Sequence, residues 1–230
     1  MIQSRLMIGI NELLVLPFDA LKDPDVLVAV IREVGLAPNP QRSYGPDDLY
    51  GRDSDGLLQI PREFAQLLVL LSDYPIGTVL DIGTFNGWST ALLTAYLFRW
   101  NPCLRVISID PEQWCPESDQ RELARLLPIT FVRATSANYH GHRFDFCFID
   151  ADHDYSAVRA DYFHVGQYAR IVAFHDINDY ELSPERHLDG GVPRFWHELK
   201  QCPREWATFR EIIHCSPGRA YMGIGVRIRS

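Results

Sequence analysis

Acidic and histidine side chains stand at or just past the ends of four apolar runs in this sequence. They are Asp81, Asp110, Asp150 and the pair His175-Asp176. Carboxylates bind cations and accept hydrogen bonds from hydroxyl groups, and histidine exchanges protons near neutral pH. One acid in such a position more often caps the next loop or helix. Four together favour a shared ligand site.

The segment DIGTFNGWST, residues 81–90, contains the glycines Gly83 and Gly87 at a predicted turn between a strand and a helix. Glycine lets the backbone approach a ligand closely, and a helix N-terminus offers unpaired N–H groups. The spacing is G-x-x-x-G, whereas dinucleotide-binding turns have G-x-G-x-x-G. A carboxylate at Asp81 would repel a pyrophosphate and attract a cation. S-adenosylmethionine, which carries an amino group and a sulfonium, therefore fits better than NAD.

Further polar positions favour a nucleoside ligand. Asp110 can accept hydrogen bonds from both hydroxyls of a ribose, as acids do in NAD sites too, so it does not separate the two cofactors. Thr135 and Ser136 follow another apolar run, where an adenine could be contacted, although plain loop hydroxyls are an equal alternative. The predicted cofactor-binding residues are Asp81, Gly83, Thr84, Gly87, Ser89, Asp110, Thr135, Ser136 and Asp150.

A parallel sheet would bring these positions together. Predicted strands cover 78–82, 105–109, 129–133, 144–149 and 170–174, and predicted helices cover 61–72, 87–98, 117–127, 155–165 and 194–201. This alternation indicates a doubly wound α/β fold with right-handed crossovers, in which ligands bind at the carboxyl ends of the strands. Two last strands, 209–215 and 222–229, flank Ser216-Pro217-Gly218 and predict an antiparallel hairpin at one edge.

The N-terminal part looks like a separate layer. Residues 1–55 contain one predicted helix at 25–34 and then a long stretch rich in Pro, Gly, Asp and Arg, which we expect to cover the site. The second predicted part of the chain comprises residues 56–230. Gly56–Gln59 directly precede its core and are candidates for contact with cofactor or substrate.

Composition limits the classes of partner. The net charge of -8 disfavours a nucleic-acid substrate, because an acidic surface repels phosphates. Five cysteines without a CxxC pair predict free thiols in a reducing compartment, and hence a cytoplasmic location. The longest apolar run, around residues 67–71, is too short to span a membrane.

The core resembles class I S-adenosylmethionine-dependent methyltransferases. Within them it is similar to the metal-assisted O-methyltransferase-like subgroup that includes macrocin-type sugar methyltransferases and cephalosporin-hydroxylase-like proteins. The segments that carry the resemblance are DIGTFNGWST, VISID, FDFCFIDADHDYSAVRADY, IVAFHDI and GGVPRFWHELK, between residues 77 and 200. The most specific part is IDADHDY followed by a strand that ends in HD. One departure is Gln167–Arg170, where such proteins often carry Gly-Gly.

This resemblance implies a Rossmann-like, seven-stranded, mostly parallel sheet with an antiparallel last strand, and makes 56–230 a methyltransferase domain. It also implies a divalent cation, most simply Mg²⁺, bound by Asp150 and Asp176. His175 is a third ligand, a second base or a packed residue. His153 is the candidate base, so that the implied catalytic residues are His153, Asp150 and His175. The acceptor would be a hydroxyl of a sugar, glycan or small metabolite.

Other interpretations stay open at this point. They are an NAD-dependent or nucleotide-sugar enzyme on the same fold class, a non-catalytic S-adenosylmethionine-binding protein, and a metal-free methyltransferase in which the histidines handle protons. A mononuclear iron enzyme could use His153, His175 and a carboxylate, but that triad usually belongs to another architecture. A homo-oligomer that pairs through the N-terminal part is a further hypothesis.

Overall fold

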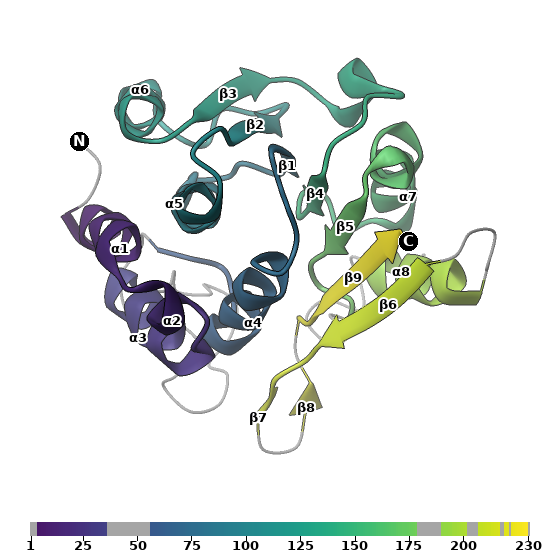
Figure 1. Cartoon of the computed structure of the whole chain (residues 1–230). Helices are drawn as coiled ribbons and strands as arrows, with labels where there is room; N and C mark the ends of the chain where they lie inside the picture. Colours follow the sequence, from purple (N-terminus) through teal and green to yellow (C-terminus); the bar gives the residue numbers. More distant parts are fainter. Residues whose placement is uncertain are drawn as a thin grey trace.

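The computed structural model describes residues 4–35, 56–178, 190–201, 207–216, 219–220 and 222–229. Seven strands form one sheet in the order β3-β2-β1-β4-β5-β9-β6, and β7 and β8 form a small ribbon beside it (Figure 1). The strands of the sheet are β1 (Thr78–Ile82), β2 (Arg105–Asp110), β3 (Ile129–Arg133), β4 (Phe146–Ile149), β5 (Ile171–Phe174), β6 (Ala207–Ile212) and β9 (Ile224–Arg229). The ribbon consists of β7 (Cys215–Ser216) and β8 (Arg219–Ala220).

The strand directions confirm the predicted fold class. Strands β1 to β5 pair in parallel with their neighbours, whereas β9 runs antiparallel to both β5 and β6. The predicted closing hairpin is therefore present, with β9 inserted between β5 and the edge strand β6. Its first strand ends at Ile212, earlier than expected, because the chain there leaves the sheet and enters the β7–β8 ribbon.

The strand order reverses beside β1. The chain runs outward from β1 through β2 to β3 and then returns to place β4 on the other side of β1. Ile82 at the end of β1 pairs with Ile109 of β2 and with Ile149 of β4. Ligands of open α/β sheets bind in the crevice at the carboxyl ends of the strands beside such a reversal.

The helices are α1 (Ser4–Val15), α2 (Phe18–Leu21), α3 (Pro24–Val34), α4 (Pro61–Leu71), α5 (Trp88–Trp100), α6 (Glu117–Leu126), α7 (Tyr155–His164) and α8 (Gly191–Gln201). Short 3₁₀ turns η1 (Ser136–Tyr139) and η2 (Gly166–Tyr168) follow β3 and α7. The helices from α3 onward match the predicted ones to within a few residues.

Helices α1 and α2 are absent from the sequence-based expectation. An interior glycine lowers helix propensity, and α1 contains Gly9. In the folded chain this glycine allows α1 to approach α3 closely, since an added Cβ would lie 2.1 Å from the Val34 side chain. Packing of this kind, which local sequence patterns do not report, stabilises α1.

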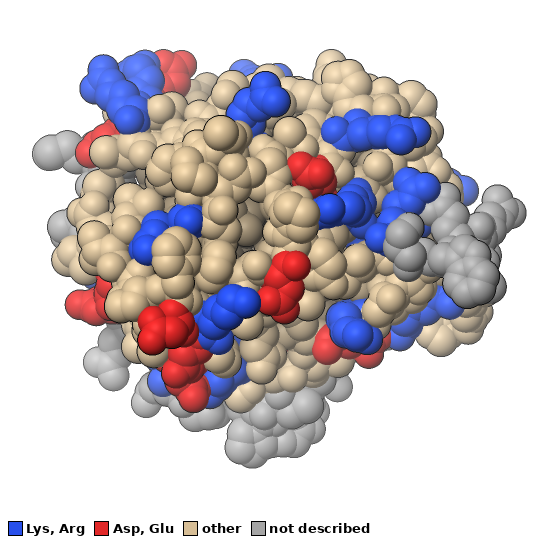
Figure 2. Space-filling model, in the orientation of Figure 1, with Lys and Arg blue, Asp and Glu red and all other residues tan. Residues whose placement is uncertain are grey.

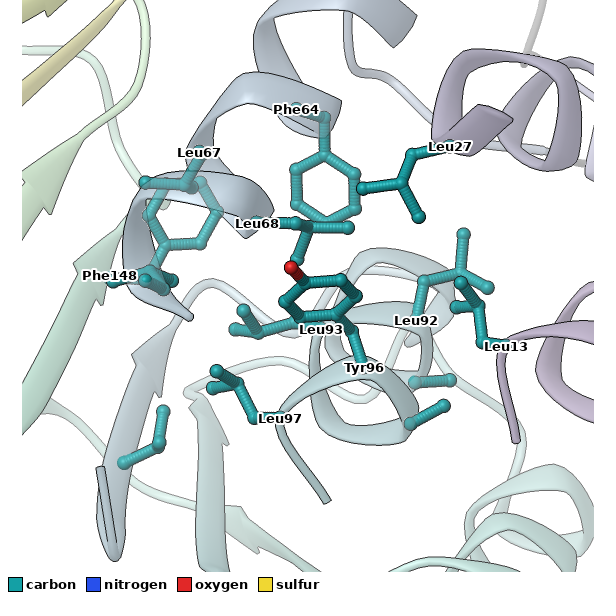
Figure 3. Packing of buried hydrophobic residues seen from close by; sticks show 14 of the residues in the cluster. Leu13, Leu27, Phe64, Leu67, Leu68, Leu92, Leu93, Tyr96, Leu97 and Phe148 are labelled. Carbon is teal, nitrogen blue, oxygen red and sulfur yellow. The ribbon is translucent and has the colours of Figure 1, made fainter. Parts of the chain in front are cut away.

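One hydrophobic core joins the N-terminal helices to the sheet. Leu13 of α1 and Leu27 of α3 lie in the same buried cluster as Phe64 of α4 and Tyr96 of α5 (Figure 3). The Tyr96 hydroxyl also donates a hydrogen bond to the carbonyl oxygen of Leu21 at 3.0 Å. The described helices of the predicted segment 1–55 thus pack against α4 and α5. Residues 36–55 lie outside the described part, so their predicted role over the site stays a prediction.

Helices α7 and α8 cover the opposite face of the sheet (Figure 1). Phe195 and Trp196 of α8 pack there on Phe174 of β5 and belong to the core. Cys147 of β4 is also fully buried, as expected for a core thiol. With helices on both faces, the central strands β1, β4 and β5 are almost entirely buried.

The outer surface carries both signs of charge. On the face in Figure 2, Lys and Arg side chains are scattered among Asp and Glu side chains. The predicted absence of a nucleic-acid partner, drawn from the net charge, stays a prediction. Every helix in the described ranges is too short or too polar to cross a membrane.

Candidate functional site

The turn between β1 and α5 depends on two glycines with left-handed backbone angles. Gly83 has φ +107° and Gly87, which caps α5, has φ +81°. A Cβ on Gly83 would lie 2.1 Å from the carbonyl oxygen of Asp150, so only glycine allows the end of β1 to approach the end of β4 this closely. Ser89 lies in the first turn of α5. The turn and Asp150 therefore form one wall of the crevice.

Asp81 is buried beneath this turn. Its Oδ2 accepts hydrogen bonds from the hydroxyls of Thr90 at 2.5 Å and Ser108 at 2.8 Å, and Thr84 Oγ1 lies 2.7 Å from Ser108 Oγ. Burial raises the pKa of Asp81 to about 7, because the charged form loses water. A cation bound nearby would lower this pKa again. Contacts of Asp81 and Thr84 with a cofactor stay predictions.

Asp110 holds the next loop and faces a cavity. Its two carboxylate oxygens accept the backbone N–H groups of Phe85 at 3.1 Å and Glu112 at 2.9 Å. The cavity, of about 490 Å³, begins at Thr84, Phe85 and Asp110 and extends along α6 and β3. Sequence reasoning missed two aromatic residues at this place. Phe85, with φ +44°, and Trp114 are both exposed, with ring centroids 6.4 Å apart.

Thr135 and Ser136 take part in local hydrogen bonds. The Thr135 hydroxyl lies 3.3 Å from Asn138 Oδ1 and caps η1. Ser136 is buried, and its hydroxyl lies 2.9 Å from His164 Nδ1 on α7. These bonds agree with plain structural hydroxyls, the alternative set against adenine contact. Contact of either residue with an adenine stays a prediction.

The ends of β4 and β5 bring carboxylates and histidines together. Asp150, His153 and Asp176 each offer a ligand atom, and these atoms lie within 4.8 Å of one another. His153 Nε2 is 3.1 Å from Asp176 Oδ2. The backbone of Asp176 has φ +61°, an unusual angle for a residue with a side chain, so tertiary contacts hold it in this position.

His175 lies behind this group. Its Nδ1 is 3.1 Å from Asp150 Oδ1 and 3.1 Å from Asp176 Oδ2, and its Nε2 is buried without a hydrogen-bond partner among the described residues. Burial opposes the charge of the ring, but the two carboxylates outweigh burial and hold its pKa well above the usual value. His175 therefore touches both predicted metal ligands. Its own predicted role as a ligand or base stays a prediction.

The segment before α4 also reaches the site. Gln59 Nε2 donates a hydrogen bond to Asp150 Oδ2 at 2.7 Å. Asn86, in the glycine turn, donates from Nδ2 to the carbonyl oxygen of Gly56 at 2.7 Å. The sequence singled out Gly56–Gln59 because they precede the core, and the structure places both ends of this segment against the crevice.

The side chains present fit the two groups that the sequence predicts. Two carboxylates and an imidazole form a donor set suited to a divalent cation. The glycine turn lacks side chains that would separate the ends of β1 and β4, and backbone exposed in this way is compatible with a small cationic cofactor. Oε1 of Gln59 is a buried hydrogen-bond acceptor that lacks a partner among the described residues.

Comparisons with known proteins agree with this geometry. Residues 80–177 match a family described as a methyltransferase domain. This range contains the glycine turn, Asp110 and the Asp150–Asp176 group. No curated protein sequence matches the chain.

Solved structures share the fold at low identity. The O-methyltransferase TomG from Streptomyces achromogenes, involved in tomaymycin synthesis and solved with SAM, is 21% identical, with 75% of this chain and 81% of that chain covered and a TM-score of 0.56. An O-methyltransferase from Bacillus cereus, solved with SAH, is 16% identical, with both chains fully covered and a TM-score of 0.53.

The same fold also supports other chemistry. The N-methyltransferase NodS from Bradyrhizobium japonicum WM9 is 17% identical, with 73% of this chain and 94% of that chain covered and a TM-score of 0.51. Fold alone therefore does not select the acceptor atom. Residues 80–177 of this chain match a methyltransferase domain, and the chain has the Rossmann-like fold of methyltransferase structures.

Proposed function

We propose that this protein is an S-adenosylmethionine-dependent methyltransferase that methylates a hydroxyl group of a sugar or other small molecule with the help of a divalent cation. The observation that carries the proposal is the convergence of Asp150, His153 and Asp176 beside the glycine turn. The match of residues 80–177 to a methyltransferase domain supports the first part. The carboxylate–histidine group supports the second.

The cofactor is expected to lie along the sheet edge. Asp110 at the end of β2 would accept the ribose hydroxyls, and the Gly83–Gly87 turn would contact the methionine end. When bound, S-adenosylmethionine supplies an electrophilic methyl group on its sulfonium. Asp150 stands on the far side of the turn, so an acceptor hydroxyl that approaches Asp150 would meet the cofactor there.

The two histidines are expected to differ in role because their exposure differs. The His153 side chain is 37% exposed and its Nε2 points to Asp176, so it can take a proton from an incoming hydroxyl. The His175 side chain is 3% exposed and its Nδ1 contacts both carboxylates, so it is suited to orient them. Asp150 and Asp176 would hold the cation, which would favour the ionised form of the acceptor hydroxyl.

Calorimetry tests both parts of the proposal. S-adenosylhomocysteine is titrated into the native protein with Mg²⁺ or with EDTA, and Mn²⁺ is titrated separately. We expect micromolar binding of S-adenosylhomocysteine. We expect Mn²⁺ binding in the native protein and its loss in Asp176→Asn, because this change removes one of two carboxylates.

The matched control is Asp152→Asn, which removes an exposed carboxylate outside the Asp150–His153–Asp176 group and should leave Mn²⁺ binding unchanged. Binding of NAD in place of S-adenosylhomocysteine would overturn the cofactor assignment. Equal Mn²⁺ binding by the native protein and Asp176→Asn would overturn the metal site.

A further inference from the structure

The side-chain amide of Gln59 has one hydrogen-bonded and one unpaired polar atom, although Gln59 is only 3% exposed. The amide Nε2 donates to Asp150 Oδ2, and the carbonyl Oε1 is buried with no partner among the described residues. The carboxylate of Asp150 can only accept when ionised, so the nitrogen must face it and the oxygen must point elsewhere. A buried acceptor that is left unpaired destabilises a protein.

Hydrogen bonds of the residues just before Gln59 hold this segment against the loop after β1. Gly56, three residues earlier, accepts a hydrogen bond from Asn86 of the glycine turn, and Leu57 N–H donates to the carbonyl oxygen of Gly35 at 3.0 Å. The segment 56–59 therefore links the loop after β1, through Gly56, to the end of β4, through Gln59. Both anchors belong to the wall that Gly83 forms with Asp150.

The position along the sheet edge selects which part of a cofactor would reach Oε1. Neighbouring strands lie about 4.8 Å apart, so Asp110 on β2 and Asp150 on β4 are separated by roughly 10 Å across β1. With the ribose at Asp110, the other end of the ligand lies over β1 and β4. That end carries an ammonium group, a strong hydrogen-bond donor, whereas the sulfonium has no hydrogen to donate.

We propose that Gln59 is a cofactor-binding residue whose Oε1 accepts a hydrogen bond from the α-amino group of S-adenosylmethionine. The inference rests on the proposed function and adds a contact from outside the 80–177 methyltransferase match. Through Nε2 the same amide holds the Asp150 carboxylate. One side chain thus links the amino end of the cofactor to a predicted metal ligand.

The test compares two ligands and three proteins by calorimetry. The ligands are S-adenosylhomocysteine and its analogue that lacks only the α-amino group. The native protein should bind the first about 10- to 100-fold more tightly, as expected for a hydrogen bond to a charged group. Gln59→Met, which keeps the length of the side chain without polar atoms, should abolish most of this discrimination.

Gln66→Met is the matched control, because Gln66 is exposed on α4 and the same change there should leave the ratio of affinities as in the native protein. Thermal unfolding of each variant establishes that it is folded. Failure of the native protein to bind either ligand would refute the proposed function. If the native protein discriminates and Gln59→Met discriminates equally, the function stands and the role of Gln59 is wrong. Loss of Mn²⁺ binding in Gln59→Met without a change in this ratio would confine the role of Gln59 to the predicted metal site and overturn the proposal.

Discussion

Gly83 illustrates how a single residue type decides the geometry of the crevice. Its backbone has φ +107°, and the space of its missing side chain is filled by the backbone of Asp150. Two costs therefore oppose any replacement. One is the left-handed backbone angle, and the other is the separation of two strand ends that hold the predicted site.

Gly83→Ala should therefore lower the free energy of unfolding by several kcal/mol, since both the angle and the clash at 2.1 Å contribute. Gly141→Ala provides the control. Gly141 also has a positive φ, +77°, but an added Cβ would meet nothing within 4 Å, so only the cost of the angle, about 1–2 kcal/mol, remains. Urea unfolding of both variants measures the difference. Equal losses of unfolding free energy in the two variants would mean that the close approach to Asp150 adds nothing to the cost of Gly83→Ala.

At the scale of elements, α4 fixes the segment that follows β5. Glu63 of α4 is fully buried, and its two oxygens accept the N–H groups of His214 at 2.7 Å and Gly223 at 3.0 Å. The carbonyl oxygen of Gly223 in turn accepts the N–H of Ile177 at 3.2 Å. One carboxylate thus ties the loop before β9 to the residue directly after Asp176.

Glu63 also makes the free energy of unfolding depend on pH, and a single substitution can isolate this contribution. Burial raises its pKa from 4.5 to about 7, against the two N–H donors and His175, which lower it, while Asp176 raises it slightly. The folded protein therefore binds this proton more tightly than the unfolded chain does. The contribution of Glu63 to the free energy of unfolding is full below pH 4.5 and is lost as the pH rises through about 7.

We expect Glu63→Gln to remove this dependence, because glutamine does not titrate in the range. The unfolding free energy of the native protein minus that of the variant should fall by about 3 kcal/mol as the pH rises from 4 to 8. Urea unfolding at a series of pH values measures it. His175 and Asp176 remain in both proteins, so their titration cancels to first order. Parallel stability curves would show that Glu63 keeps its ordinary pKa in the folded chain.

At the scale of the molecule, the N-terminal helices and the sheet share a core. Arg99 of α5 donates hydrogen bonds to the carbonyl oxygens of Leu13 and Leu16, and Phe18 of α2 packs on Trp100 with centroids 5.0 Å apart. These contacts join α1 and α2 to α5. The predicted boundary at residue 55 therefore divides two stretches of the sequence, but the helices described in the first stretch pack against helices of the second.

This shared core predicts one cooperative unfolding transition. Trp100 reports on the contact with α2, and Trp196 reports on the opposite face of the sheet. In Trp100→Phe and Trp196→Phe, urea transitions followed by fluorescence should coincide with those followed by far-UV circular dichroism. A fluorescence change at lower urea only when Trp100 is present would indicate that α1–α3 unfold as a separate unit.

Local patterns of the sequence determined the sheet and most of its helices. Buried parallel strands are continuous apolar runs, so their ends were visible, and the polar residues there mark the crevice. Asp81, Asp110, Asp150 and Asp176 could be placed at one edge because parallel strands all end on the same side. Helix α1 escaped prediction because its stability comes from contact with α3 and α5.

Tertiary structure alone decided how side chains from distant segments meet. Gln59 reaches Asp150 across 91 residues of sequence, and Glu63 reaches Gly223 across 160. No periodicity encodes such pairs, because they depend on where loops close in space. The same holds for the two histidines. The sequence placed both near strand ends, but only packing buries His175 between two carboxylates and leaves the His153 side chain 37% exposed.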